Sequence, residues 1–303
     1  MRVGIMIEAQ RGLNWPRWKR IGRAVEDLGF VGLWRSDHFV SSDGTFEDAL
    51  ELWVSLAWLA DNTSRIEFGP LVTPVSFRHP VWTARMGKDV DDLSGGRLVL
   101  GVGTGWQEQE HRMFGFELLP LRERFARFEE GLEVITRLLR SDEPVTFHGR
   151  HFRLEGAMLM PRPSRPGGPP ILVGGNGRRR TLPLAARYAD EWNGLFIPPA
   201  QYAELNRYLD TLLQDIGRRP EDVRRSVMTG LVFGRTEREL QEKLRGRDAA
   251  ALRERGIVVG TPTQVADQVR AFLDAGAERV ILQWLDLDDM DGLEALARSV
   301  ENV

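Results

Sequence analysis

Short runs of consecutive apolar residues alternate with longer segments of helical period along nearly the whole chain. Most of the runs are continuously apolar and do not alternate with polar residues, which is typical of parallel strands buried on both faces. This pattern predicts eight strands, at residues 2–8, 31–36, 66–72, 97–103, 170–175, 191–196, 226–234 and 279–285.

The segments between these runs predict helices. The clearest is 121–139, where apolar side chains recur every three or four residues and so share one face. The segment 47–62 is apolar around most of its circumference, which predicts a helix that is buried or contacts another copy of the chain. Gly29 and Gly276 follow helical segments and suit the left-handed position that ends a helix.

Eight strands alternating with helices predict an α/β fold, a (β/α)8 TIM barrel formed by residues 1–303 as a single domain. A doubly wound open sheet is the alternative. The main insertion is 143–169, which predicts a hairpin followed by a Pro/Gly-rich approach to the fifth strand. The segment 235–262 is expected to be irregular, and no linker divides the chain.

Composition removes several function classes. The net charge of −3 gives no reason to expect nucleic acid or an anionic membrane as a partner. With no cysteine, disulfides, thiolate catalysis and Cys-ligated metals are excluded, and the five histidines show no metal-ligand spacing. The N-terminus lacks the features of a secretion signal and no apolar stretch is long enough for a membrane helix, so we expect a cytoplasmic protein.

The chemistry of such a barrel sits at the carboxyl ends of its strands. In "WRSDHF" (34–39), Asp37 and His38 lie where the second predicted strand becomes a loop. Because successive residues of an extended chain point to opposite sides, we expect His38 to reach the barrel axis and Asp37 to hold the backbone or another side chain. The alternative is a structural Asp–His pair that caps the turn.

Three further strand ends combine glycines with apolar or hydroxyl groups. "GGNGRRR" (174–180) precedes a helix and predicts an anion site, with a plain tight turn as the alternative. "GVGTGW" (101–106) suits a flat ring lying against backbone, unless Trp106 belongs to the core. "GPLVTP" (69–74) predicts a smooth wall with Thr73 as a hydrogen-bonding group, or a strand ended by Pro74.

Taken together, several segments resemble the bacterial luciferase-like family of flavin and deazaflavin oxidoreductases, and most closely its coenzyme F420-dependent branch. The resemblance covers nearly the whole chain. It rests on "GLWRSDHF", "TSRIEFGPLVTPVSFRHP", "DDLSGGRLVLGVGTGW", "PPILVGGNGRRRTLPLAARYADEWN" and "VGTPTQVADQV", in this order and spacing.

The resemblance implies a TIM barrel that holds a flavin-like ring at its C-terminal mouth. It implies a non-prolyl cis peptide bond within residues 70–72, against which the ring packs. Asp37 and His38 match the family's position beside the reactive face of the ring. The cofactor-binding residues implied or suggested are Pro70, Leu71 and Thr73 beside the ring, Gly103, Thr104, Gly105 and Trp106 at its edge, and Gly174, Gly175, Asn176, Gly177 and Arg178 around its phosphate.

One position departs from the family's F420-dependent sugar-phosphate dehydrogenases. Those enzymes carry a Glu directly after "GTG" that serves as a proton donor, whereas this chain has Trp106 there. Sugar-phosphate oxidation is therefore disfavoured. The candidates for the proton-carrying group are His38, Glu8 and Glu108.

Three functions follow as hypotheses. The first is hydride transfer between coenzyme F420 and a small organic substrate, in a homodimer that the resemblance suggests and whose interface includes helix 47–62. The second is an FMN-dependent monooxygenase, because both cofactors offer a tricyclic ring and a phosphate. The third is a catalytically silent flavin-binding barrel, which the convergence of polar groups at six strand ends disfavours.

Overall fold

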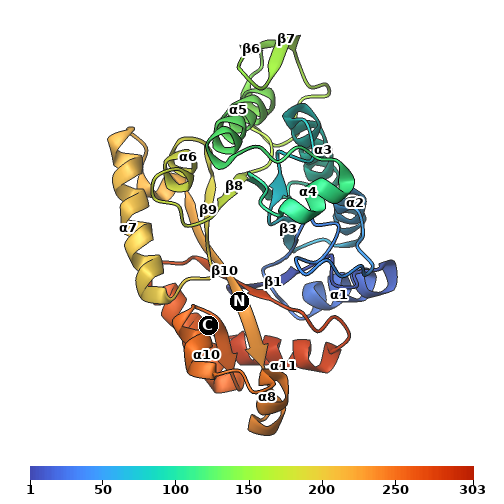
Figure 1. The fold of residues 1–303 in the computed structure, drawn as a ribbon, viewed down its shortest axis with the longest axis vertical. Coiled ribbons are helices and arrows are strands. Elements are labelled where there is room, and N and C mark those ends of the chain that lie inside the picture. The colour runs from blue at the N-terminus through green and yellow to red at the C-terminus, as the bar shows by residue number, and fades with distance from the viewer.

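The strands form a closed, mostly parallel barrel in the computed structural model, which describes residues 1–303 (Figure 1). The sheet runs in the order β3-β2-β1-β12-β10-β9-β8-β5-β4, and Phe68 pairs with Leu98 across the remaining seam. All eight predicted strands are therefore present. Their bounds are β1 (Val3–Ile7), β2 (Gly32–Arg35), β3 (Glu67–Pro70) with β4 (Thr73–Pro74), β5 (Leu100–Gly103), β8 (Ile171–Gly174), β9 (Glu191–Leu195), β10 (Arg224–Phe233) and β12 (Arg279–Gln283).

The third barrel strand is interrupted between β3 and β4. Its first part pairs with β2, with Arg35 opposite Pro70, and its second part pairs with β5, with Thr73 opposite Val102. The peptide bond between Leu71 and Val72 is cis, within the three residues that the resemblance indicated. The interruption turns Leu71 and Val72 toward the carboxyl end of the barrel, where both line a cavity.

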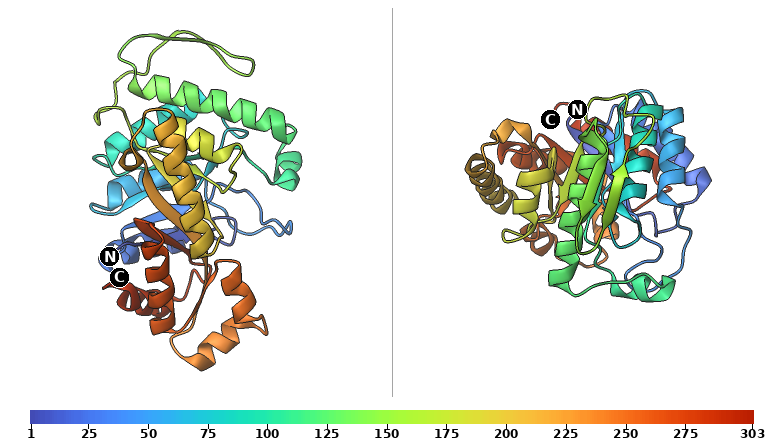
Figure 2. Two further views of the ribbon diagram at one scale, coloured as in Figure 1. Left: turned by 90° about the vertical axis from the view of Figure 1, so that its left-hand side faces the viewer. Right: turned by 90° about the horizontal axis from the view of Figure 1, so that it is seen from above.

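Helices surround the barrel and follow its strands in sequence (Figures 1 and 2). Apolar faces at helical spacing, such as that of α5, bury against the strands in a core of 64 residues. A separate cluster of seven buried side chains fills the barrel interior. The helices are α1 (Trp15–Asp27), α2 (Leu52–Asn62), α3 (Pro80–Leu93), α4 (Glu108–Phe114), α5 (Leu121–Arg140), α6 (Thr181–Tyr188), α7 (Pro199–Asp215), α10 (Pro262–Asp274) and α11 (Met290–Val300), with a 3-10 turn at Pro220–Asp222.

Helix α2 is shorter than predicted, because residues 47–51 are not helical. The buried guanidinium of Arg35 donates to the carbonyl oxygens of Leu50 and Glu51 at 2.6 and 3.1 Å. The Glu51 carboxylate then accepts from the N–H of Val54 and caps the helix. The apolar pattern predicted a start five residues too early, since the start of α2 is set by Arg35, a residue on β2.

The two long insertions have different outcomes. Segment 143–169 contains the predicted hairpin, antiparallel β6 (Val145–His148) and β7 (Arg153–Ala157), which lies at one end of the molecule (Figure 1). The expectation of an irregular 235–262 is wrong. That stretch contains α8 (Glu237–Leu244), α9 (Ala249–Glu254) and β11 (Val258–Gly260), which pairs with β10.

These short elements were missed because each shows at most two turns of helical period, too few to stand out from the surrounding charged residues. They are held by a small apolar cluster of their own, which consists of Val232, Leu240, Leu244, Leu252 and Val259. No helix of the chain is both long enough and apolar enough to cross a membrane.

Candidate active site

A cavity of about 400 Å³ opens at the carboxyl ends of the barrel strands. Every barrel strand, or the loop that follows it, contributes to its wall, as expected for this architecture. The lining residues are Met6, Glu8, Gln10, Arg11, Ser36, His38, Ser42, Leu71, Val72, Pro74, Gly103, Thr104, Gly105, Trp106, Gln107, Glu110, Gly174, Leu195, Phe196, Met228, Gln283 and Leu285.

His38 forms a pair with a buried carboxylate at the wall of this cavity. Its Nδ1 lies 2.7 Å from Oε1 of Glu110, whose side chain is 1% exposed, whereas the His38 side chain is 17% exposed. The second carboxylate oxygen, Oε2, accepts from the backbone N–H of Phe39 at 3.1 Å. The indole of Trp106 meets the His38 ring edge-to-face at a centroid distance of 5.6 Å. These contacts fix the orientation of the imidazole.

Two opposing effects act on the pKa of His38. Burial by itself lowers the pKa, because it disfavours the charged imidazolium. The hydrogen bond and the negative charge of Glu110 outweigh burial, with smaller contributions from Glu8 and Asp37, and raise the pKa above its ordinary value of 6.5. The imidazolium form of His38 is thus favoured more than it is in a free histidine.

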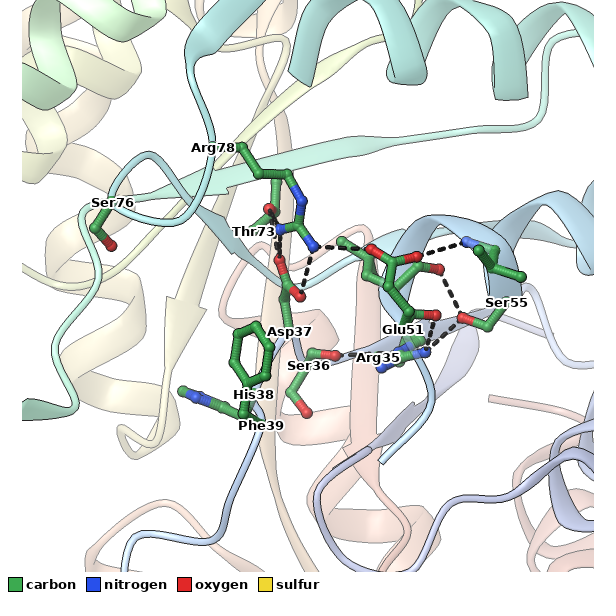
Figure 3. A network of polar contacts seen from close by, with 12 residues as sticks. Arg35, Ser36, Asp37, His38, Phe39, Glu51, Ser55, Thr73, Ser76 and Arg78 are labelled. Atoms are coloured by element: carbon green, nitrogen blue, oxygen red, sulfur yellow. Dashed lines mark hydrogen bonds and ion pairs between the residues drawn. The ribbon is translucent and has the colours of Figure 1, made fainter. Parts of the chain in front are cut away.

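Asp37 points away from the cavity, as the alternation of an extended chain predicted. One of its carboxylate oxygens accepts from the hydroxyl of Thr73 at 2.7 Å and forms an ion pair with Arg78 (Figure 3). Arg78 also contacts Glu51 at 2.9 Å, and the carboxylates of Asp37 and Glu51 together raise the pKa of Arg78 against the effect of burial. The network ties the loop that carries His38 to the start of α2.

A chain of amide and carboxylate groups crosses the other side of the cavity. Glu8 accepts from the side-chain amides of Gln283 at 2.6 Å and Gln10 at 2.9 Å, one on each carboxylate oxygen. The hydroxyl of Ser36 donates to Gln10 at 2.8 Å. Since amide N–H groups only donate, both oxygens of Glu8 act as acceptors.

Part of the wall is apolar and closely packed. Val72 packs so closely on Gly103 that a Cβ there would lie 2.5 Å from its Cγ2. At the rim, Trp106, Phe196 and Leu285 are 61, 39 and 43% exposed. Trp106 is therefore not a core residue, and the alternative interpretation of "GVGTGW" is wrong.

The loop after β8 meets the cavity through Gly174. Gly175 has a φ of 126°, a conformation that favours glycine, and Asn176 uses both amide atoms to hold the backbone of Leu195. Arg178 forms an ion pair with Glu204 and lies over the ring of Tyr208.

The cavity brings together much of the predicted site, namely His38, Leu71, Gly103, Thr104, Gly105, Trp106 and Gly174. It does not include Asp37, Pro70, Thr73, Gly175, Asn176, Gly177, Arg178 or Glu108 in its wall. Glu108 is exposed at the start of α4, whereas Glu110 is buried against His38. Glu110 is not predictable from the sequence, since "WQEQEH" contains both acids and no local feature shows which one turns inward.

The residues present fit a planar ring with polar edges. A cavity of about 400 Å³ lies within the range of about 300–1,000 Å³ that is usual for small-molecule sites. Met6, Leu71, Val72 and Met228 offer apolar contact, while Ser36, Thr104 and Gln107 offer hydrogen-bonding groups beside it.

The sequence was then compared with known proteins. A sequence profile for luciferase-like monooxygenases matches residues 1–253. The chain is 28% identical over 295 residues to an F420-dependent glucose-6-phosphate dehydrogenase of Amycolatopsis mediterranei, a match that covers 85% of each chain. It is 33% identical over 188 residues to 4-hydroxyprotoasukamycin monooxygenase of Streptomyces nodosus subsp. asukaensis, covering 62% of this chain and only 49% of that relative.

Among solved structures, an F420-dependent secondary alcohol dehydrogenase in complex with an F420-acetone adduct superposes with a TM-score of 0.84. That match covers 99% of this chain and 98% of the other at 17% identity, so it supports the barrel fold alone. The profile match, which extends over most of the chain, decides the family: this protein belongs to the luciferase-like monooxygenase family.

Proposed function

We propose that this chain is an oxidoreductase that transfers a hydride between coenzyme F420 and a small organic substrate at the C-terminal mouth of the barrel. The observation that carries the proposal is His38, which a buried carboxylate holds in the wall of a cavity with an apolar floor. The similarity to an F420-dependent dehydrogenase, which covers 85% of each chain, supports the choice of cofactor.

When bound, the cofactor supplies the carbon that gives or takes the hydride. Leu71, Val72 and the strip from Gly103 to Trp106 would hold its ring, and the loop 174–178 would hold its phosphate. His38 carries the proton: with Nδ1 donating to Glu110, Nε2 is the ring atom left to exchange a proton with the substrate. Rim side chains such as Phe196 exclude water from the floor.

The carboxylates near His38 have different roles in this proposal. Asp37 is a positioning residue, because its carboxylate holds Thr73 and Arg78 and lies outside the cavity wall. Glu8 is occupied as an acceptor of two amide hydrogen bonds, which suits it poorly to donating a proton. Glu110 replaces Glu108 among the candidate acids, since it is the acid in contact with His38.

Two measurements test the proposal. Titration of the apoprotein with F420 and with FMN, followed by fluorescence quenching, is expected to show tight binding of F420. His38→Ala should reduce turnover by about 100-fold or more while cofactor affinity stays unchanged. His148→Ala, on the exposed hairpin, is the matched control and should leave both quantities as they are. Tight binding of FMN with none of F420 would reject the choice of cofactor.

FMN-dependent monooxygenation is the second candidate. It is favoured by the similarity to 4-hydroxyprotoasukamycin monooxygenase, and the same cavity would hold the flavin ring. Oxygen-dependent product formation with reduced FMN would select it. Retention of cofactor affinity with no turnover over a wide substrate panel would instead indicate a catalytically silent flavin-binding barrel.

We further propose a homodimer. Helices α2 and α3 expose large apolar side chains, with Val54, Trp82 and Leu93 at 58, 55 and 54% exposure. Burying them against a second copy removes this apolar surface from water. Light scattering should then give twice the chain mass of 34.4 kDa, and a monomer mass would contradict the proposal.

A further inference from the structure

A second cavity, of about 670 Å³, lies beside the first at the carboxyl ends of β10 and β12 and against α8. The two cavities share Arg11, Gln283 and Leu285 in their walls. The two cavities are therefore neighbours, separated by no more than these side chains. Nothing in the proposed hydride transfer uses this second space.

The wall of the second cavity is cationic. Four basic side chains, Arg11, Lys243, Arg245 and Arg247, line it together with one carboxylate, that of Asp286. The ammonium group of Lys243 forms ion pairs with carboxylates. No carboxylate lies within ion-pair distance of the guanidinium groups of Arg11, Arg245 and Arg247. Three positive charges at one opening attract an anion and raise its local concentration.

Lys243 has a structural role in this wall. Its ammonium group contacts Asp289 at 2.7 Å and Glu239 at 3.2 Å and lies over the ring of Trp284. These contacts fix the end of α8. The guanidinium of Arg247 donates to the carbonyl oxygens of Leu244 and Lys243 at the same end, both at 3.0 Å, whereas that of Arg245 makes no such contact. Trp284 is 4% exposed, and its indole N–H has no acceptor, so the wall holds an unused donor besides its cations.

The first cavity has the opposite character. Its wall carries the carboxylates of Glu8 and Glu110, and the positive charge of His38 is compensated by Glu110. The carboxylates of the first cavity repel an oxyanion, whereas the basic side chains of the second cavity, beyond Arg11, attract it. Loops after the seventh and eighth strands of such barrels also commonly bind phosphate, and β10 and β12 are those strands here.

We propose that the second cavity binds the oxyanion of the organic substrate, a phosphate, sulfonate or carboxylate group, while the reacting carbon lies in the first cavity beside His38. This proposal rests on the proposed function, and it deepens it by naming an anionic substrate class. The phosphate of the cofactor remains assigned to the loop 174–178, on the strand β8 side of the mouth.

Binding of inorganic phosphate to the purified protein tests the anion site. Calorimetry at constant ionic strength should show saturable binding to the wild-type chain and about tenfold or weaker affinity for the double variant Arg11→Gln/Arg245→Gln. The double variant Arg23→Gln/Arg238→Gln makes the same change in net charge at exposed positions outside both cavities and should bind like wild type. No binding to the wild type, or equal loss in both double variants, would overturn the proposal.

Fluorescence titration of the single variant Arg245→Gln with F420 and FMN separates the two sources of an anion, because Arg245 lines the second cavity only. Unchanged cofactor affinity in Arg245→Gln supports assignment to the substrate. Parallel loss of phosphate and cofactor affinity would assign the cavity to the cofactor's own phosphate and overturn the proposal. If neither cofactor binds the wild type while phosphate binding follows the predicted pattern, the anion site is supported and only the proposed function fails.

Discussion

His38 shows how one buried carboxylate changes the chemistry of its neighbour. Burial favours a neutral imidazole, whereas the hydrogen-bonded charge of Glu110 favours imidazolium, and the second effect is the larger. Since the pKa of His38 is higher in the folded than in the unfolded chain, its protonation stabilises the fold. That contribution is fully present below pH 6.5 and is lost as the pH rises through the folded-state pKa.

Glu110→Gln removes the charge but keeps the size of the side chain. We expect the pKa of His38 to fall, because burial is then opposed only by the smaller effects of Glu8 and Asp37, and the corresponding limb of the pH–rate profile to move to lower pH. NMR titration of His38 measures the shift directly. Glu108→Gln changes an exposed acid two residues earlier and should leave the titration unchanged; a shift in that variant would restore Glu108 as the partner.

The hairpin of β6 and β7 depends on a single side chain of α5 for much of its attachment. Glu130 accepts hydrogen bonds from the backbone N–H groups of Arg150, His151 and Phe152 at 2.9, 2.8 and 3.1 Å. These donors belong to the turn between the two strands, and the hairpin lies beside α5 at one end of the molecule (Figure 2). A two-stranded ribbon is marginal without such support.

Glu130→Ala should therefore loosen the hairpin without unfolding the barrel. Three backbone donors lose a charged acceptor, and the local cost is about 1–3 kcal/mol. Hydrogen exchange followed by mass spectrometry should show faster exchange confined to residues 145–157. The control is Glu129→Ala, which removes an exposed partner of Arg187 on the same helix. Faster exchange throughout the barrel strands would show that the hairpin is not an independent element.

The two ends of the barrel have different roles. The amino ends of the strands are closed by ion pairs, in which Arg279 donates to Glu191 at 3.0 Å and also pairs with Glu67. Arg279 is 3% exposed and lies over Trp34, one of the side chains that fill the barrel. The carboxyl ends carry the two cavities. Residues of the closed end are thus expected to govern stability, and those of the open end to govern binding.

Glu191→Gln tests this division. It leaves Arg279 buried with only Glu67 to compensate its charge, and we expect the free energy of unfolding to fall by about 3 kcal/mol. Urea unfolding measures the change, and cofactor affinity below the transition should remain at the wild-type value. Glu242→Gln breaks an exposed pair on α8 and should change stability by less than about 1 kcal/mol. Loss of cofactor affinity at unchanged stability would contradict the assignment.

The number and order of barrel strands were predictable, because each is a continuous apolar run and parallel strands buried on both faces need such runs. The orientation of His38 and Asp37 was also predictable from the alternation of an extended chain. By contrast, the position at which α2 begins depends on Arg35, which lies 15 residues before Leu50. No pattern in the residues around Leu50 indicates this contact. The elements in 235–262 were too short for their period to be recognised.

Local periodicity and short motifs are sufficient to predict the barrel, its hairpin insertion, its family resemblance and the strand ends that meet at the mouth. They do not predict that Glu110, and not Glu108, contacts His38, or that Arg11 and Arg245 line one cavity. The residues of these pairs are 72 and 234 positions apart, and they come together through the way loops fold over a closed barrel. The sequence neighbours of either residue do not carry that information.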